Sequence, residues 1–206
     1  GKAVEGVTLL IAADGEILAK GPNIMMGYFG NPTATAEVID ADGWFHTGDI
    51  GQIDSEGFLA ITDRKKELIV NAYGKNIAPA PIENGLKSSR WIAQAVVIGD
   101  KRQFLTGLVV PDFEVVRAWA EKEGLASAPN DQLIANPKLR ALIKTDIDKV
   151  NAELARYEQV RAWDLLPNEF TLETGELTPT LKVKRRIILQ KYGDVLERLY
   201  SENDAG

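Results

Sequence analysis

The chain has 206 residues, of which 45% are hydrophobic and 26% are charged, values typical of a globular protein rather than a disordered or membrane-spanning one. Its net charge of −6 argues against general electrostatic attraction to nucleic acid, and no apolar run approaches the roughly 20 residues that cross a bilayer. The absence of cysteine excludes disulfides and thiolate metal sites, and it fits a reducing cytoplasm.

The first third of the chain predicts two β-hairpins with a short helix between them. In the first hairpin, Asp14 and Gly15 separate two apolar runs, and this pair is a strong turn signal because the turn needs positive φ. The paired runs are residues 7–11 with 16–19, and residues 50–53 with 58–61. Residues 32–38 predict the helix, with proline near its start.

A charged segment, residues 63–67, ends this β-rich part. We place a domain boundary there, with residues 1–64 in one domain and residues 65–206 in the next. The chain begins at Gly1, almost inside a strand, so we expect a piece of a longer protein. The fold class that follows is α+β, with a β-rich part before a mixed α/β part.

The second part mixes strand and helix patterns. The predicted strands are residues 67–70, 95–98, 105–110 and 161–166, and the predicted helices are residues 82–88, 113–123, 137–157 and 184–201. The clearest helix is 137–157, because Asn136 can cap it and Pro137 suits its first position. Its apolar residues recur at helical spacing and predict one buried face: Leu139, Leu142, Ile143, Ile147, Val150 and Leu154.

Four sequence motifs carry more information than these patterns. They are GEILAKGP with GYFGNP at 15–32, DGWFHTGD at 42–49, GFLAITDRKKE with GKNIAP at 57–79, and LTPTLKVKR at 177–185. Together and in this order they resemble the AMP-forming (ANL) adenylating superfamily of acyl-CoA synthetases, firefly luciferases and peptide-synthetase adenylation domains. The resemblance runs from about residue 15 to about residue 192.

Details of the last motif indicate one branch of that superfamily. Many members have glycine immediately before the lysine of this motif, whereas this chain has Leu181 before Lys182. This variant, with GELT at 175–178 and YEQV at 157–160, resembles the long-chain fatty acid CoA ligases. We therefore expect the β-rich end of a large N-terminal domain, followed by a small mobile C-terminal domain.

The resemblance implies a reaction in two steps. A fatty acid and ATP first give an acyl-adenylate and pyrophosphate, and the acyl group then passes to the thiol of coenzyme A with release of AMP. The first step gathers anions and needs positive charge in a dry site. The second step needs that charge withdrawn while the thiol approaches.

The resemblance also implies roles for five residues. Asp49 is expected to accept hydrogen bonds from the nucleotide ribose, and Arg64 to contact the same nucleotide. Lys66 is expected at the hinge, Gly74 beside the pantetheine channel, and Lys182 as the catalytic lysine at the carboxylate and α-phosphate. For Gly74 an ordinary turn with positive φ is an equal alternative.

Other parts of such an enzyme are missing from this sequence. The phosphate loop, the acyl pocket and the Mg²⁺-binding glutamate lie upstream in the family, so we expect no metal ligand here and no adenylation by this chain alone. The β-rich part should expose an apolar face, through which the chain could dimerise. His46 is the single histidine, and we expect it to pack or hydrogen-bond beside Asp49 rather than to act as a base.

Two other functions stay open at this point. One is a related adenylating ligase that loads another acid or a carrier protein. The other is a nucleotide- or CoA-binding or interaction module without catalysis. We expect a cytoplasmic location, with peripheral attachment to a membrane as an alternative. We expect no transmembrane segment and no nucleic-acid partner.

Overall fold

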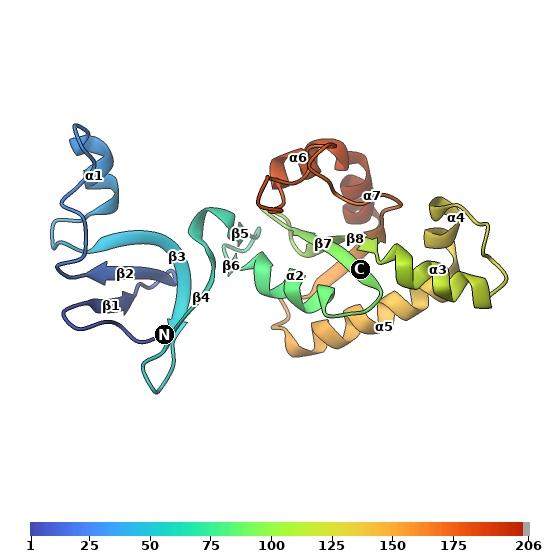
Figure 1. The fold of residues 1–206 in the computed structure, drawn as a ribbon, viewed down its shortest axis with the longest axis horizontal. Helices are drawn as coiled ribbons and strands as arrows, with labels where there is room; N and C mark the ends of the chain where they lie inside the picture. The colour runs from blue at the N-terminus through green and yellow to red at the C-terminus, as the bar shows by residue number, and fades with distance from the viewer. Residues whose placement is uncertain (204–206) are drawn as a thin grey trace. The chain divides into compact units, whose positions relative to one another are not determined.

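The computed structural model describes residues 1–203 and divides into two compact units (Figure 1). The first unit is Gly1–Leu68, and the second begins at Ile69. The division thus falls after residue 68, whereas the boundary predicted from the charged segment follows residue 64. Each unit contains a sheet of its own.

The first unit is a four-stranded antiparallel sheet in chain order. Its strands are β1 (Thr8–Ile11), β2 (Glu16–Lys20), β3 (Phe45–Ile53) and β4 (Leu59–Arg64). Both predicted hairpins are confirmed. At their turns Gly15 and Gly57 have φ values of +87° and +83°, which glycine adopts without the strain of a side chain. Asp14 and Asp54 stabilise these turns by accepting backbone N–H bonds.

The predicted helix in this unit is also present as α1 (Pro32–Val38). Asn31 caps it, since its Oδ1 accepts a hydrogen bond of 3.0 Å from the Ala34 N–H. Strand β3 begins at Phe45, five residues before the predicted start at residue 50, because Phe45 and His46 already pair with β2. The segment from His46 to Asp49 therefore lies inside a strand.

The second unit has a three-stranded sheet and a two-stranded ribbon. The strands are β7 (Ile92–Ile98), β8 (Leu105–Pro111), β9 (Val160–Leu165), and in the ribbon β5 (Ile69–Val70) and β6 (Asn76–Ile77). β8 pairs antiparallel with β7 and parallel with β9, and all of its residues are buried. The strand predicted at 67–70 begins only at Ile69, because residues 65–67 form the 3₁₀ turn η1 (Lys65–Glu67).

Helices cover both faces of this sheet (Figure 1). They are α2 (Pro79–Lys87), α3 (Phe113–Lys122), α4 (Asn130–Ala135), α5 (Pro137–Glu153), α6 (Arg185–Lys191) and α7 (Gly193–Asn203). Side chains alternate between the two faces along each strand. Val97 and Val109 pack with α2, α3 and α5, whereas Val96 and Leu108 pack with α6 and α7.

Two helix predictions need correction. The helix predicted over 137–157 ends at Glu153, where Leu154 turns to an extended conformation with ψ of 150°. The single helix predicted over 184–201 is wrong, because Tyr192 leaves the helical region at ψ of 19° and Gly193 begins a separate helix. Glycine in a helix interior costs roughly 1 kcal/mol relative to alanine, which favours a break at this position.

Candidate functional site

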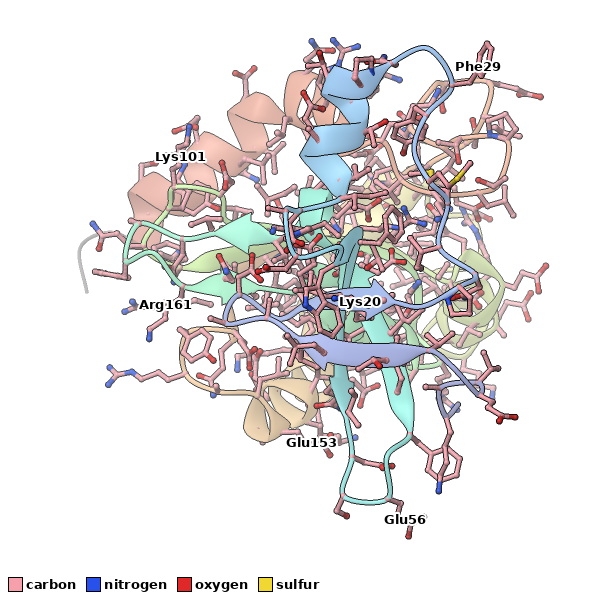
Figure 2. All side chains as sticks on the ribbon, turned by 90° about the vertical axis from the view of Figure 1, so that its left-hand side faces the viewer. Lys20, Phe29, Glu56, Lys101, Glu153 and Arg161 are labelled. Carbon is pink, nitrogen blue, oxygen red and sulfur yellow. The ribbon has the colours of Figure 1, made fainter. Side chains whose placement is uncertain are left out.

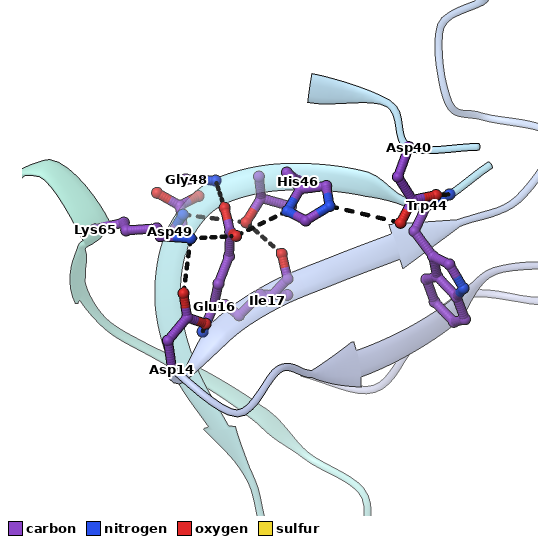
Figure 3. Close-up of polar contacts among 10 residues, drawn as sticks. Asp14, Glu16, Ile17, Asp40, Trp44, His46, Gly48, Asp49 and Lys65 are labelled. Carbon is purple, nitrogen blue, oxygen red and sulfur yellow. Dashed lines mark hydrogen bonds and ion pairs between the residues drawn. The ribbon is translucent and has the colours of Figure 1, made fainter. Parts of the chain in front are cut away.

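Glu16 lies at the centre of a polar network in the first unit (Figure 3). Its Oε1 accepts a hydrogen bond of 2.9 Å from the Gly48 N–H. Its Oε2 lies 2.9 Å from His46 Nδ1 and 2.8 Å from Lys65 Nζ. Because Glu16 is only 3% exposed, these three partners replace the water that its carboxylate would otherwise bind.

The same network fixes the strand segment before Asp49. The Thr47 hydroxyl donates to the Ile17 carbonyl at 2.7 Å and accepts the Asp49 N–H at 3.1 Å. Lys65 Nζ also lies 2.7 Å from Asp14, so it joins the hairpin turn to η1. The Thr47 and Lys65 side chains thus connect the backbone beside Asp49 to β2 and to the first hairpin turn.

The network shifts the pKa values of Glu16 and Lys65. Burial raises the pKa of Glu16, but hydrogen bonds from Lys65, His46 and the Gly48 N–H outweigh this effect and hold that pKa below its usual range. The hydrogen bond to Asp14, followed by the bond to Glu16, raises the pKa of Lys65. Both groups are therefore ionised at neutral pH.

Asp49 and Arg64 face each other on neighbouring strands. Arg64 Nε lies 2.7 Å from Asp49 Oδ1, and the side chain of Asp49 is 23% exposed while that of Arg64 is 62% exposed. The carboxylate is oriented yet still open to solvent, with Oδ2 able to accept further hydrogen bonds. The structure thus brings together two of the residues predicted to contact a nucleotide. His46 is hydrogen-bonded in the Glu16 network, as expected for a structural role.

Lys66 lies exposed in η1, near the end of the first unit. In the chain, η1 is a single short turn between β4 and β5. Lys66 has no contribution to the Glu16 network, in contrast to its neighbour Lys65.

Gly74 occupies an exposed turn between β5 and β6 in the second unit. Its φ is +73°, and a Cβ at this position would meet no atom within 4 Å. The conformation therefore favours glycine, and the space beside it is open. Asn71, which is 4% exposed, stabilises this turn by accepting the Tyr73 and Lys75 N–H groups at 3.0 and 2.9 Å.

Lys182 lies in a short loop that we call the lysine loop, residues 177–183, whose ends Leu177 and Val183 form a β-bridge. The Thr178 N–H donates to the Lys182 carbonyl at 2.8 Å, and the Lys182 N–H donates to Thr178 Oγ1 at 3.0 Å. The Lys182 side chain is exposed. Leu181 has a φ of +59°, a left-handed conformation that glycine adopts more readily than leucine.

Sequence reasoning missed several polar residues that form hydrogen bonds near the predicted ones. Glu16 and Lys65 both lie inside motifs that we identified, yet their contact depends on the pairing of β3 with both β2 and β4. Asn71 precedes Gly74 by three residues, and an Asn before a glycine turn is a recognisable signal. Glu83 and Arg185, which pair at 2.7 Å, are 102 residues apart and gave no joint signal.

Comparisons with known proteins agree with the family resemblance of the sequence motifs. Residues 66–204 match the family model described as "AMP-binding enzyme C-terminal domain". The chain is 43% identical over 203 residues to Long-chain-fatty-acid--CoA ligase FadD15 of Mycobacterium tuberculosis, and 42% identical over 191 residues to Long-chain-fatty-acid--CoA ligase 6 of Homo sapiens. These alignments cover 98% and 91% of this chain, but only 34% and 27% of the relatives.

A solved structure resembles both the fold and the sequence. It is the A domain of carboxylic acid reductase from Segniliparus rugosus, in complex with AMP and a co-purified carboxylic acid. The TM-score is 0.73 at 25% identity, over 98% of this chain and 33% of that one. The chain thus spans about a third of the length of the proteins that it matches.

Proposed function

This chain belongs to the family of AMP-binding enzyme C-terminal domains, and on that premise we propose that it is part of an AMP-forming long-chain fatty acid–CoA ligase. The observation that carries the proposal is the identity of 42–43% to two such ligases across more than nine tenths of the chain. The geometry around Asp49 and Lys182 supports it. The alternative of a module without catalysis has no comparable support.

In the proposed first step, a fatty acid carboxylate attacks the α-phosphate of ATP, and pyrophosphate leaves. Asp49 binds the ribose hydroxyls through its open carboxylate oxygen, while Arg64 orients that carboxylate and contacts the nucleotide. Lys182 supplies positive charge where the carboxylate and α-phosphate meet. Its long stem and exposed position in the lysine loop suit such a reach.

In the proposed second step, the thiol of coenzyme A attacks the acyl carbon, the thiol proton is lost, and AMP leaves. Rotation about Lys66 withdraws Lys182 and brings the Gly74 turn to the pantetheine arm. The open space beside Gly74 supports this role, because a narrow chain could pass where a side chain would stand. In this scheme residues 1–64 end the large adenylating domain, and residues 65–206 form the mobile one.

We assign Mg²⁺ to the part of the ligase outside this chain. Within residues 1–203, no three histidine or carboxylate side chains gather in a way that could hold a metal ion. The steps above involve the nucleotide, the acid and the thiol only.

The surface of the first unit supports association with further protein. Met26, Phe29 and Ile61 are 101%, 106% and 64% exposed. Figure 2 shows Phe29 at the end of the loop before α1, directed away from the sheet. Exposed apolar side chains favour burial in an interface. We propose that the remaining two thirds of the ligase cover them, and that the chain alone dimerises through them.

For location we propose the cytoplasm, with peripheral attachment to a membrane as the second candidate. Through residue 203, no helix has the length and apolar character needed to cross a bilayer. A fatty acid substrate partitions into membranes, which supports the second candidate.

The test uses the full-length protein that contains this chain. It is incubated with ATP, coenzyme A and acids from acetate to long-chain fatty acids, and both acid-dependent pyrophosphate exchange and acyl-CoA are measured. We expect the highest kcat/KM with long-chain acids and no exchange by the chain alone. Activity confined to short acids or to a carrier protein would favour a related adenylating ligase instead.

A further inference from the structure

We infer that Glu83 and Arg185 are positioning residues that hold the lysine loop in place for adenylate formation. This inference rests on the proposed function, because it assigns a purpose to the position of Lys182. It concerns residues of three separate elements: α2, β7 and the start of α6.

Arg185 connects the lysine loop to β7, an edge strand of the sheet. It is the first residue of α6 and follows Lys182 by three positions. Its Nη1 donates to the Val97 carbonyl at 2.7 Å, and its Nη2 donates to Glu83 Oε1 at 2.7 Å. The same Glu83 oxygen accepts the Val97 N–H at 2.8 Å. The planar guanidinium thus closes a ring of contacts with one carboxylate and one strand residue.

A second carboxylate holds the other end of the loop. Glu176 is 3% exposed, and its side chain accepts hydrogen bonds from Thr174 and from Lys191 Nζ, the latter at 2.9 Å. Its backbone carbonyl accepts the Lys184 N–H at 2.7 Å. Since Lys191 ends α6 and Arg185 begins it, both ends of the loop are attached to this one helix. Glu83 then fixes the helix to α2 and β7.

These contacts are poorly explained by stability alone. The side chains of Glu83 and Arg185 are only 12% and 23% exposed, so both charges have lost much of their water. Buried ion pairs seldom stabilise a fold more than apolar residues of the same size would. Burial raises the pKa of Glu83 despite the neighbouring Arg185, which shows that the ionised carboxylate is held at a cost. A fixed geometry for the loop accounts for that cost.

The backbone of the loop is under strain as well. Leu181, the residue before Lys182, has a left-handed φ of +59° without being glycine. Such strain persists only where the surrounding structure over-determines the conformation, and it clusters at functional sites. The contacts of Glu83 and Glu176 on either side of the loop hold Leu181 in this conformation. The loop is therefore rigid at its base while the lysine side chain stays free to extend.

Positioning has a measurable value in catalysis. A displacement of about 1 Å at a reacting group can reduce the rate by about 100-fold. We expect Glu83→Gln and Arg185→Lys to lower kcat for adenylate formation by about 10- to 100-fold. Glu83→Gln keeps an acceptor for the Val97 N–H. Arg185→Lys keeps the positive charge but loses the planar guanidinium, which donates to two partners at once.

The experiment measures the two half-reactions separately in the full-length protein. Acid-dependent pyrophosphate exchange reports adenylate formation, and supplied acyl-adenylate with coenzyme A reports the thioester step. Asp164→Asn is the matched control, because Asp164 also accepts a backbone N–H and pairs with arginine, Arg140 at 3.0 Å, in the same unit. It belongs to β9, outside the lysine loop and its anchors.

The expected result is a loss confined to kcat of adenylate formation. KM for ATP and the thioester step should stay within about two-fold, and Glu83→Gln should add little to the loss in a Lys182→Ala protein. Equal losses in both half-reactions, matching Asp164→Asn, would overturn the inference and leave a structural role only. The inference would also be overturned if the loss caused by Glu83→Gln added fully to the loss caused by Lys182→Ala.

Amide hydrogen exchange separates this inference from the proposed function. The Lys182 and Lys184 amides should exchange at least about ten-fold faster in Glu83→Gln than in Asp164→Asn. If the wild-type protein activates no acid, the proposed function fails, and exchange alone decides whether Glu83 holds the loop. Unchanged exchange at both amides would overturn the inference under either outcome.

Discussion

Asp49 Oδ1 lies 2.7 Å from Arg64 Nε across two paired strands. The contact uses one carboxylate oxygen and leaves the other for a ligand. It also connects two motifs that are fifteen positions apart in the sequence, 49 and 64. We therefore expect the two side chains to act on a nucleotide as a unit.

Substitution of Asp49 should change how the enzyme recognises ribose. In the full-length protein, Asp49→Ala should raise KM for ATP by at least about 100-fold, because two hydrogen bonds from ribose hydroxyls to a charged acceptor are lost at about 1.5–3 kcal/mol each. The wild-type protein should discriminate against 2′-deoxy- and 3′-deoxy-ATP, and the variant should not. Glu56→Ala, on the exposed hairpin turn of the same unit, is the control. Retained discrimination in Asp49→Ala would contradict the assignment.

Removal of the Glu16 carboxylate should destabilise the first unit. Glu16→Ala leaves Lys65 and the Gly48 N–H without their buried partner, a loss of about 1–3 kcal/mol in the free energy of unfolding. Denaturation of the chain in urea measures it, with Glu37→Ala on α1 as the exposed control. If the two variants unfold at the same urea concentration, the network has no stabilising role.

The stability of the second unit should fall in acid partly through Glu176. Burial raises the pKa of this carboxyl, but hydrogen bonds from Thr174 and Lys191 outweigh it and lower the pKa to about 2, from 4.5. Because the folded pKa is the lower one, the stabilisation is complete above pH 4.5 and disappears as pH falls towards 2. Urea unfolding from pH 7 down to pH 3 should therefore show a smaller pH dependence in Glu176→Gln. An unchanged slope would rule out this contribution.

The strained loop residue offers a comparison of two substitutions. Leu181→Gly relieves roughly 1–2 kcal/mol of left-handed strain, but it adds freedom to the unfolded chain, which costs roughly 0.5–1 kcal/mol. Leu181→Val keeps the strain and adds a branched Cβ. We expect the valine variant to be less stable than the glycine variant by about 1 kcal/mol in urea denaturation. The reverse order would show that Leu181 is not constrained in this way.

Gly74→Ala should show whether Gly74 serves only the conformation of its turn or also leaves space for the pantetheine arm. Alanine at a φ of +73° should lower the free energy of unfolding by roughly 1 kcal/mol, because the left-handed conformation is strained for a residue with a Cβ. No steric clash adds to this loss, since a Cβ there meets no atom within 4 Å. If the pantetheine arm passes this turn, the thioester step should fall more than adenylate formation. Equal effects on both half-reactions would leave Gly74 with a conformational role alone.

Much of the fold follows from local signals in the sequence. The Asp-Gly turn at residues 14–15 and the Asn136–Pro137 helix start were recognisable because each acts within a few residues. The break between α6 and α7 was not predicted, since the apolar spacing continues through Tyr192 and a single glycine at position 193 is a weak signal against that pattern.

The site was predictable only in part, and for a related reason. Motifs indicated Asp49, Arg64 and Lys182 individually, but not which partners hold them. Glu16 reaches Lys65 and Gly48 through strand pairing, and Glu83 reaches Arg185 across 102 positions. Such contacts depend on tertiary structure, which periodicity and spacing do not encode.

The most direct test of the account is the effect of Lys182→Ala on the two half-reactions of the full-length protein. We predict that acid-dependent pyrophosphate exchange falls by at least about 100-fold, because a charge at the reacting centre is lost. The transfer of a supplied acyl-adenylate to coenzyme A should stay near the wild-type rate. Adenylate formation at the wild-type rate in Lys182→Ala would contradict the proposed function of this chain.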